Sequence, residues 1–173
     1  MGPREGRARP ELAQVDSHAI EPNPDSWSGR VVRVIDGDTI DVMHNGRSER
    51  VRLNAVDCPE RGQPFGTAAK QFTSSLVFGQ AVIVRSSGQD RYGRTIGDVV
   101  LPDGHSLNPE LVKAGMAWWY RQYSSDKTLE ALETEARAQR HGLWADAHPI
   151  APWEWRQPSR TSALPEQDQP TKP

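Results

Sequence analysis

Four acidic residues and one arginine lie close together in the segment 31–60. They are Asp36, Asp38, Asp57, Glu60 and Arg52. The residues between them are largely apolar, and carboxylates placed beside apolar strands lose hydration and repel one another unless a cation compensates them. Carboxylate and carbonyl oxygens select Ca²⁺ or Mg²⁺, and Ca²⁺ tolerates an irregular, partly hydrated shell. The segment therefore predicts a site for a hard divalent metal, with Ca²⁺ favoured.

A β-hairpin is expected to position these acids. Asn45-Gly46 is a strong signal for a two-residue turn, because both positions of a type I′ turn need positive φ. This turn predicts the pairs His44–Arg47, Asp41–Arg50, Ile40–Val51 and Thr39–Arg52, with Ile40, Val42, Val51 and Leu53 on the core face and Asp41–Arg50 exposed. The register alone does not bring Asp38 and Arg52 to one face, so Gly37 is expected to mark a bend or bulge that re-aims the carboxylate.

Other patterns predict the scaffold. Apolar residues at helical spacing predict a helix from Phe65 to about Leu76. Short apolar runs predict strands over 81–84 and 96–101. Asn108 before a proline predicts an N-cap and a short second helix, and a third helix is predicted over about 125–141 with Gly142 as its stop. Short strands with segregated helices favour an α+β fold whose strands curl into a small barrel.

Composition limits the function classes. The chain has 173 residues, enough for one domain, and a formal net charge of −2, so attraction to nucleic acid needs local positive charge. A single cysteine, Cys58, excludes an internal disulfide and a thiolate zinc site, and the five histidines lack ligand spacing. Residues 1–27 and 157–173 are expected to be disordered.

The predicted leader holds no apolar run long enough for a signal peptide or a membrane span. The chain as written is therefore expected to be cytoplasmic and not membrane-bound. Export is expected only if the sequence is a mature or truncated form. Localisation stays open.

Two arginines suit phosphate chemistry. Arg52 is expected within a strand, and Arg94 closes the turn Asp90-Arg91-Tyr92-Gly93-Arg94. A guanidinium is a permanently charged planar fork that can hold two oxygens of one phosphate and stabilise the charge that grows during its hydrolysis.

Several of these segments together resemble the signature segments of the staphylococcal nuclease family. The matching segments are Asp36-Gly37-Asp38-Thr39, Arg52-Leu53, Val56-Asp57-Cys58-Pro59-Glu60 and Asp90-Arg91-Tyr92-Gly93-Arg94. Their order and separations match, and the resemblance runs from about Ser28 to Trp155. It implies a nuclease domain over 28–156, built as a five-stranded OB-type barrel with three helices.

The resemblance also implies a role for each matching residue. Asp38, Asp57 and the backbone carbonyl of Cys58 would bind Ca²⁺, with Asp36 holding metal-bound water. Cys58 stands where threonine is expected, a change that a main-chain ligand tolerates. The catalytic residues would be Arg52, Glu60 and Arg94; neighbouring cations weaken a carboxylate as a base, so we expect Glu60 to orient the attacking water. Substrate contacts are assigned to Arg91, Tyr92 and Tyr123, while Arg121 replaces a second expected tyrosine.

The prediction is a monomeric, calcium-dependent nuclease acting on DNA and RNA, with a preference for single strands and with 3′-phosphate products. Two alternatives stay open. One is a catalytically weak nucleic-acid-binding or scaffold module on the same barrel, and the other is a structural calcium site on an interaction domain. An EF-hand fits poorly, because the loop lacks glycine at its sixth position and has Arg47 where the closing glutamate belongs.

Overall fold

A computed structural model describes residues 24–157. Most of the predicted leader, residues 1–23, and almost all of the predicted tail, residues 158–173, lie outside this range, so the expectation of disorder there stays a prediction. The first strand begins at Ser26, within the stretch assigned to the leader.

Five strands form a closed barrel, which confirms the predicted α+β OB-type architecture. In order around the barrel they are β1 (Ser26–Asp36), β2 (Thr39–His44), β3 (Arg47–Leu53), β6 (Thr95–Val100) and β5 (Ala81–Gln89). All pairs are antiparallel except β3 and β6. Valine dominates the buried positions, as expected where β-branched side chains fill a small barrel.

The predicted β2–β3 hairpin is confirmed in every pair. His44 faces Arg47, Asp41 faces Arg50, Ile40 faces Val51 and Thr39 faces Arg52. The expectation that the Asp41–Arg50 pair is exposed was wrong for its acidic member. The Asp41 side chain is only 9% exposed, because Arg33 of β1 approaches it as well.

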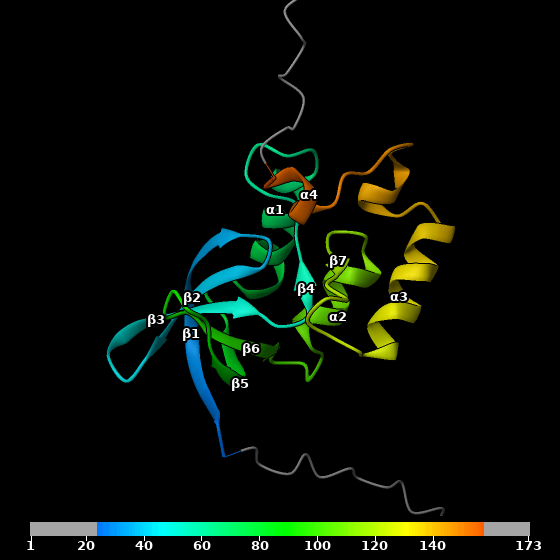
Figure 1. Cartoon of the computed structure of the whole chain (residues 1–173). Helices are drawn as coiled ribbons and strands as arrows, with labels where there is room; N and C mark the ends of the chain where they lie inside the picture. The colour runs from blue at the N-terminus through cyan, green and yellow to red at the C-terminus, as the bar shows by residue number, and fades with distance from the viewer. Residues whose placement is uncertain (1–23, 158–173) are drawn as a thin grey trace, which may run out of the picture.

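The helices lie on the sides of the barrel (Figure 1). The three predicted helices are α1 (Gly66–Val77), α2 (Leu107–Lys113) and α3 (Lys127–Ala138). Two short elements follow, the 3-10 helix η1 (Gly142–Ala145) and α4 (Pro152–Trp155), and the short strands β4 (Val56–Asp57) and β7 (Trp118–Trp119) pair with each other. Four-residue helices were not predicted, because so short a segment has no readable periodicity.

Two predicted helix ends were wrong. The N-cap of α2 is Ser106, and Asn108 lies inside the helix with a buried side chain. The Asn108 amide accepts from the backbone N–H of Val99 and donates to the carbonyl of Asn54, so it joins α2 to the barrel. The third helix was predicted to end near residue 141. Helix α3 ends at Ala138 instead, and Arg140, with φ of 54°, lies in the left-handed region before Gly142.

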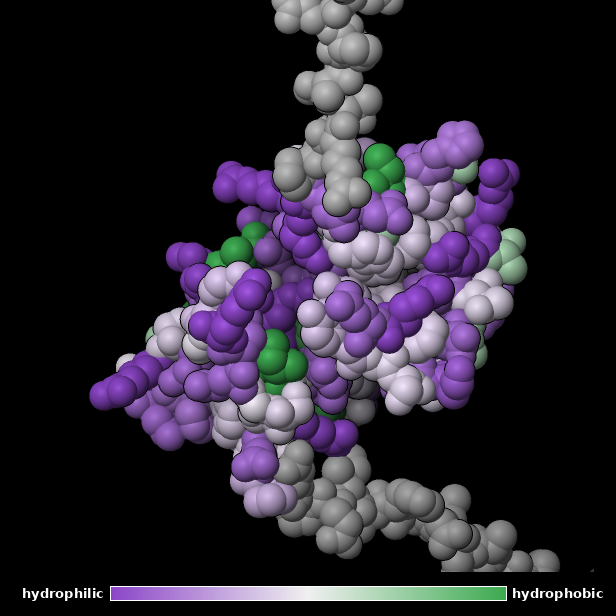
Figure 2. Space-filling view, in the orientation of Figure 1, coloured by the Kyte–Doolittle hydropathy of each residue, from purple (hydrophilic) through white to green (hydrophobic). Residues whose placement is uncertain are grey.

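Apolar residues form two clusters. The larger fills the barrel and extends under α1 and α2. The smaller joins Trp118 and Ala136 to Leu143, Trp144 and Ala151, and so fastens the last described segment to α3 and β7. Hydrophilic side chains dominate the face seen in Figure 2, including the recess between the barrel and the helical side. No helix in residues 24–157 is long and apolar enough to cross a membrane.

Candidate active site

The turn that carries Asp38 is fixed by close packing. Gly37 and Asp38 connect β1 to β2, next to a register shift in the β1–β2 pairing. A Cβ on Gly37 would lie 2.8 Å from Sγ of Cys58, so no larger residue fits there. Thr73 of α1 donates its hydroxyl to the Gly37 carbonyl at 2.5 Å. The predicted bend therefore lies beside a register shift, and the lack of space next to Cys58 restricts position 37 to glycine.

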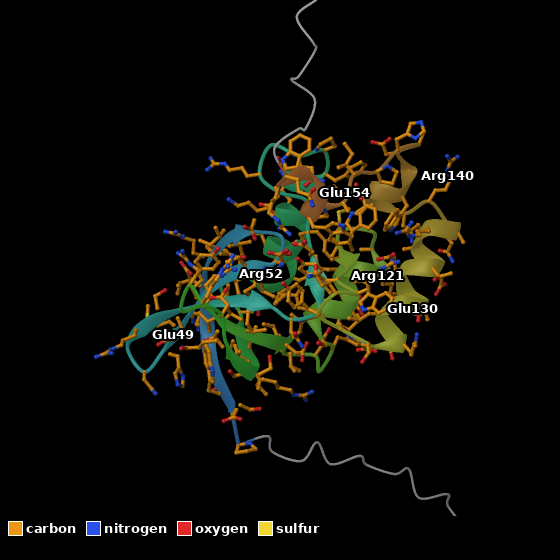
Figure 3. The ribbon with its side chains drawn as sticks, viewed as in Figure 1. Glu49, Arg52, Arg121, Glu130, Arg140 and Glu154 are labelled. Atoms are coloured by element: carbon orange, nitrogen blue, oxygen red, sulfur yellow. The ribbon has the colours of Figure 1, made fainter. Side chains whose placement is uncertain are left out.

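Arg52 joins the two buried aspartates. Its Nη2 donates to Oδ1 of Asp57 at 2.9 Å, and its Nε lies 3.3 Å from Oδ1 of Asp38. The other oxygen of Asp38 accepts from the backbone N–H of Cys58 at 2.6 Å. Both aspartates are almost fully buried, so a turn, a strand end and an arginine of β3 converge at one point. Figure 3 shows Arg52 on the side of the barrel that faces α1 and α4.

The hydrogen bonds of Arg52 limit what it can offer a substrate. Its Nη1 donates to the carbonyls of Leu53 and Val56, at 2.6 and 2.8 Å. A guanidinium has five N–H groups. One Nη2 hydrogen is donated to Asp57, and Nε forms an ion pair with Asp38, so the Nε hydrogen and the second Nη2 hydrogen are outside the hydrogen bonds of the described residues. Three of the five N–H groups therefore hold the site together, and the expectation that Arg52 grips two phosphate oxygens stays a prediction.

Glu60 lies on a loop that is anchored at several points. Its backbone N–H donates to Oε1 of Gln63, and the Gln63 amide donates to the carbonyl of Ile150. Gly66, at the start of α1, leaves room for the Glu60 carbonyl, which a Cβ would meet at 2.1 Å. The Glu60 side chain is one-third exposed and pairs with Arg156, which also binds Asp57. Asp57 and Glu60 are thus brought to one guanidinium.

The cluster carries surplus negative charge in a poorly hydrated place. Burial, followed by the charge of Asp38, raises the pKa of Asp36 to about 7. Burial also raises the pKa of Asp57 above its ordinary value, although Arg156 and Arg52 act in the opposite direction. These shifts mean that the local arginines do not fully compensate the acids, and an added cation would. Burial raises the pKa of the Cys58 thiol, so this side chain stays a neutral, packed group.

Arg94 is held apart from the Asp38–Asp57–Glu60 cluster. Its Nε donates to Asp90 at 2.7 Å within the turn before β6. Because Thr95 pairs with Val51, Arg94 lies at the level of Arg50, about two residues before Arg52 along the parallel strand. A hollow there is lined by Asp41, Ser48, Arg50, Tyr92, Gly93 and Arg94. The structure thus places Arg94 in this hollow, about two residues along the parallel strands from Arg52.

The residues assigned to substrate lie on the surface. Tyr92 is 68% exposed, with the Arg91 guanidinium over its ring at 4.9 Å. Tyr123 is 67% exposed and packs edge to face against Tyr120 at 4.7 Å. An exposed aromatic ring is available to stack on a base. Tyr120, rather than Arg121, therefore supplies the second ring next to Tyr123.

Arg121 has a structural role instead. Its Nη2 bonds Oε1 of Glu133, a buried residue of α3, and its guanidinium lies over the Trp119 ring at 5.2 Å. The other Glu133 oxygen accepts from the Trp119 backbone N–H at 2.7 Å. Arg121 thus stabilises the packing of α3 against β7, and Figure 3 shows it on that side of the molecule.

Sequence reasoning missed Arg156 and Gln63. Arg156 is 99 residues from Asp57 and follows a short segment rich in tryptophan. One signal was available: the acids of the hairpin outnumber the arginines predicted beside them, so a further cation had to come from elsewhere. Its position in sequence could not be deduced from that count.

Comparison with known proteins identifies the family. Residues 50–146 match the family model described as staphylococcal nuclease homologue. An uncharacterised endonuclease of Escherichia coli O157:H7 is 49% identical over 128 residues, covering 74% of this chain and 84% of the relative. Micrococcal nuclease of Shigella flexneri is 44% identical over 146 residues, covering 79% and 84%. The chain belongs to the staphylococcal nuclease family, which confirms the resemblance.

Proposed function

We propose that this nuclease depends on Ca²⁺, hydrolyses both DNA and RNA with a preference for single strands, leaves 3′-phosphate ends and acts as a monomer. The observation that carries the proposal is the convergence of two buried carboxylates, Asp38 and Asp57, on Arg52 with Glu60 beside them. The family and the names of its relatives support a nuclease. The metal rests on the oxygen donors of the site, whereas the substrate preference and the 3′-phosphate products are what the likeness to the family implies.

The donor set fits Ca²⁺. Among residues 24–157 no three acidic, histidine or cysteine side chains form a ready metal cage. Asp38 and Asp57 would instead be joined by the carbonyl of Cys58 and by water, with Asp36 accepting from that water. Ca²⁺ accepts such mixed oxygen shells, whereas a single cysteine cannot build a thiolate metal site. When bound, the ion would supply positive charge that neutralises the scissile phosphate.

The other side chains of the site have separate roles in the proposed reaction. Glu60, one-third exposed at the rim, can orient a water molecule toward phosphorus. Arg94 uses only its Nε on Asp90 within the described chain, so both Nη groups can bind two oxygens of one phosphate. Arg52 supports the ligands and can add a contact through the Nη2 hydrogen that is not donated to Asp57. Arg91, Tyr92 and Tyr123 would hold the neighbouring phosphate and bases.

The proposal is tested with a 5′-labelled single-stranded oligonucleotide and Ca²⁺, with and without a chelator. We expect cleavage that the chelator abolishes, with fragments whose mass shows a 3′-phosphate. Glu60→Gln should reduce the cleavage rate about 10²- to 10⁴-fold, the range for loss of a group that assists proton transfer. Glu130→Gln on α3 removes an equal charge on a helix outside the acid cluster and should cut normally.

Three outcomes would contradict the proposal. Cleavage that persists in the chelator would exclude the metal. Equal rates in Glu60→Gln and Glu130→Gln would remove Glu60 from the site. Oligonucleotide binding without cleavage would favour the alternative, a nucleic-acid-binding module.

A further inference from the structure

Arg156 occupies the acids that the proposed metal would use. Its Nη2 donates to Oδ2 of Asp57 at 2.6 Å, and its Nη1 donates to Oδ1 of Asp57 at 3.2 Å. Nη1 also donates to Oε1 of Glu60. Arg52 holds Oδ1 of Asp57 from the other side. Both oxygens of the buried Asp57 therefore already have a cationic partner.

The position of Arg156 is defined by packing. It follows α4, whose Trp153 stacks on Tyr120 at 5.3 Å with an angle of 6° between the rings. The segment before α4 is held through the Gln63 amide, which donates to the Ile150 carbonyl at 2.7 Å. Gln63 also fixes the backbone of Glu60. The same contacts thus place Glu60 and the segment that delivers Arg156.

A metal ion and this guanidinium cannot use Asp57 in the same way at once. A Ca²⁺ ion needs a carboxylate lone pair at about 2.3–2.6 Å, where a second cation would be repelled. Both Asp57 oxygens are engaged by Arg156, and Asp57 itself is buried too deeply to rotate into solvent. Oδ1 accepts from both Arg52 and Arg156 and Oδ2 accepts from Arg156, so a metal ion could reach only the remaining lone pair of Oδ2, where it would lie beside the Arg156 guanidinium and be repelled by it.

We propose that Arg156 is a tethered cation that competes with the divalent metal for Asp57 and Glu60. It compensates these acids while no metal is bound, and metal binding displaces its guanidinium. The inference rests on the proposed function, since it takes Asp57 as a metal ligand. It adds a consequence: Arg156 lowers metal affinity, and metal binding loosens the segment around α4.

The test is calorimetric titration of CaCl₂ into the full chain stripped of metal. We expect Arg156→Gln to bind Ca²⁺ about tenfold more tightly than the wild type, because one competing positive charge is gone. Arg156→Lys keeps the charge but loses the two-point grip on Asp57, so its affinity should lie between the two. Arg61→Gln is the control: it removes an equal charge next to Glu60, and Arg61 is exposed with no ion pair among the described residues. The Ca²⁺ affinity of Arg61→Gln should rise far less than that of Arg156→Gln.

A second measurement compares the wild type with and without Ca²⁺ and uses Arg156→Gln as its control. Hydrogen exchange of the wild type should show faster exchange of the backbone amides of Trp153–Arg156 with Ca²⁺ than with a chelator, because the anchor of this segment is released. Arg156→Gln should exchange fast in both conditions. Circular dichroism spectra confirm that each variant is folded before titration.

The outcomes separate the two proposals. If the wild type neither takes up Ca²⁺ nor cleaves DNA, the proposed function fails. If the wild type binds Ca²⁺ and cleaves, but Arg156→Gln has equal or weaker affinity, the competition is refuted and the nuclease stands. Unchanged exchange at α4 on addition of Ca²⁺ would refute the displacement of Arg156.

Discussion

Replacing Arg52 by glutamine should cost stability as well as activity. The Arg52 side chain is 12% exposed and serves two backbone carbonyls and two buried carboxylates. Removing one partner of a buried ion pair typically costs 3–5 kcal/mol, because the other charge is left uncompensated. Asp57 keeps Arg156 here, so we expect the lower end, about 3 kcal/mol.

Arg94→Gln is the matched comparison. Its partner Asp90 lies in a turn at the surface, and the Arg94 side chain is 32% exposed. Exposed ion pairs contribute about 0.2–1 kcal/mol, so this variant should remain close to the wild type in stability. Both variants remove one positive charge and one predicted catalytic arginine. Activity is expected to fall in both, and only stability distinguishes them.

The assay is urea unfolding followed by tryptophan fluorescence. It is carried out in the presence of a chelator, so that bound metal does not contribute to the free energy of unfolding. With a urea dependence of about 1–3 kcal/mol/M, a loss of 3 kcal/mol lowers the midpoint by about 1–3 M. Arg94→Gln should shift it by less than about 1 M, and by at most about a third of the Arg52→Gln shift. Equal midpoints for the two variants would show that Arg52 does not hold the buried aspartates, and the description of the site given above would be wrong.

Three further changes test the scaffold and the substrate surface. Asn108→Asp removes the hydrogen bond donated to Asn54 and buries a charge, so urea unfolding should show a loss of about 2–4 kcal/mol in the free energy of unfolding. An unchanged free energy of unfolding would contradict this, because only an N-cap position would accept aspartate without loss. Gly37→Ala forces a methyl group against Cys58 and should lower the free energy of unfolding by about 1–3 kcal/mol in the same assay, with slower cleavage. Stability and cleavage equal to those of the wild type would mean that the turn at Gly37 can shift to make room for the methyl group. Tyr123→Ala should raise the KM for single-stranded DNA about 5- to 100-fold, and an unchanged KM would exclude base stacking there.

Local sequence signals predicted the elements that local interactions define. The Asn45-Gly46 turn fixed the register of β2 and β3, because a two-residue loop leaves one pairing that keeps Ile40 and Val51 inside. The span of α1 was predicted to within a residue or two by its apolar spacing. The predicted acids converge for the same reason: Asp38 and Asp57 flank strands that this hairpin places together.

Long-range contacts were beyond the reach of the same reasoning. Asn108 has the residue type and the neighbouring proline of an N-cap, yet the barrel uses its amide to satisfy backbone groups of β6 and of the loop after β3. Arg156 reaches Asp57 across 99 residues through α4, a helix too short to be predicted. In both cases a tertiary partner outweighs the local preference, and single-sequence patterns carry no information about that partner.

The two predicted catalytic arginines show why residue type alone does not assign a role. Both were predicted from the same chemistry, a charged fork aimed at phosphate. In the structure Arg52 donates three of its five N–H groups to Leu53, Val56 and Asp57 and forms an ion pair with Asp38, whereas the Arg94 guanidinium donates one to Asp90. A donor already bound to the protein must lose that bond before it can bind substrate. In the proposed mechanism Arg52 therefore chiefly holds the acids together, and Arg94, whose two Nη groups make no hydrogen bond among the described residues, grips the phosphate.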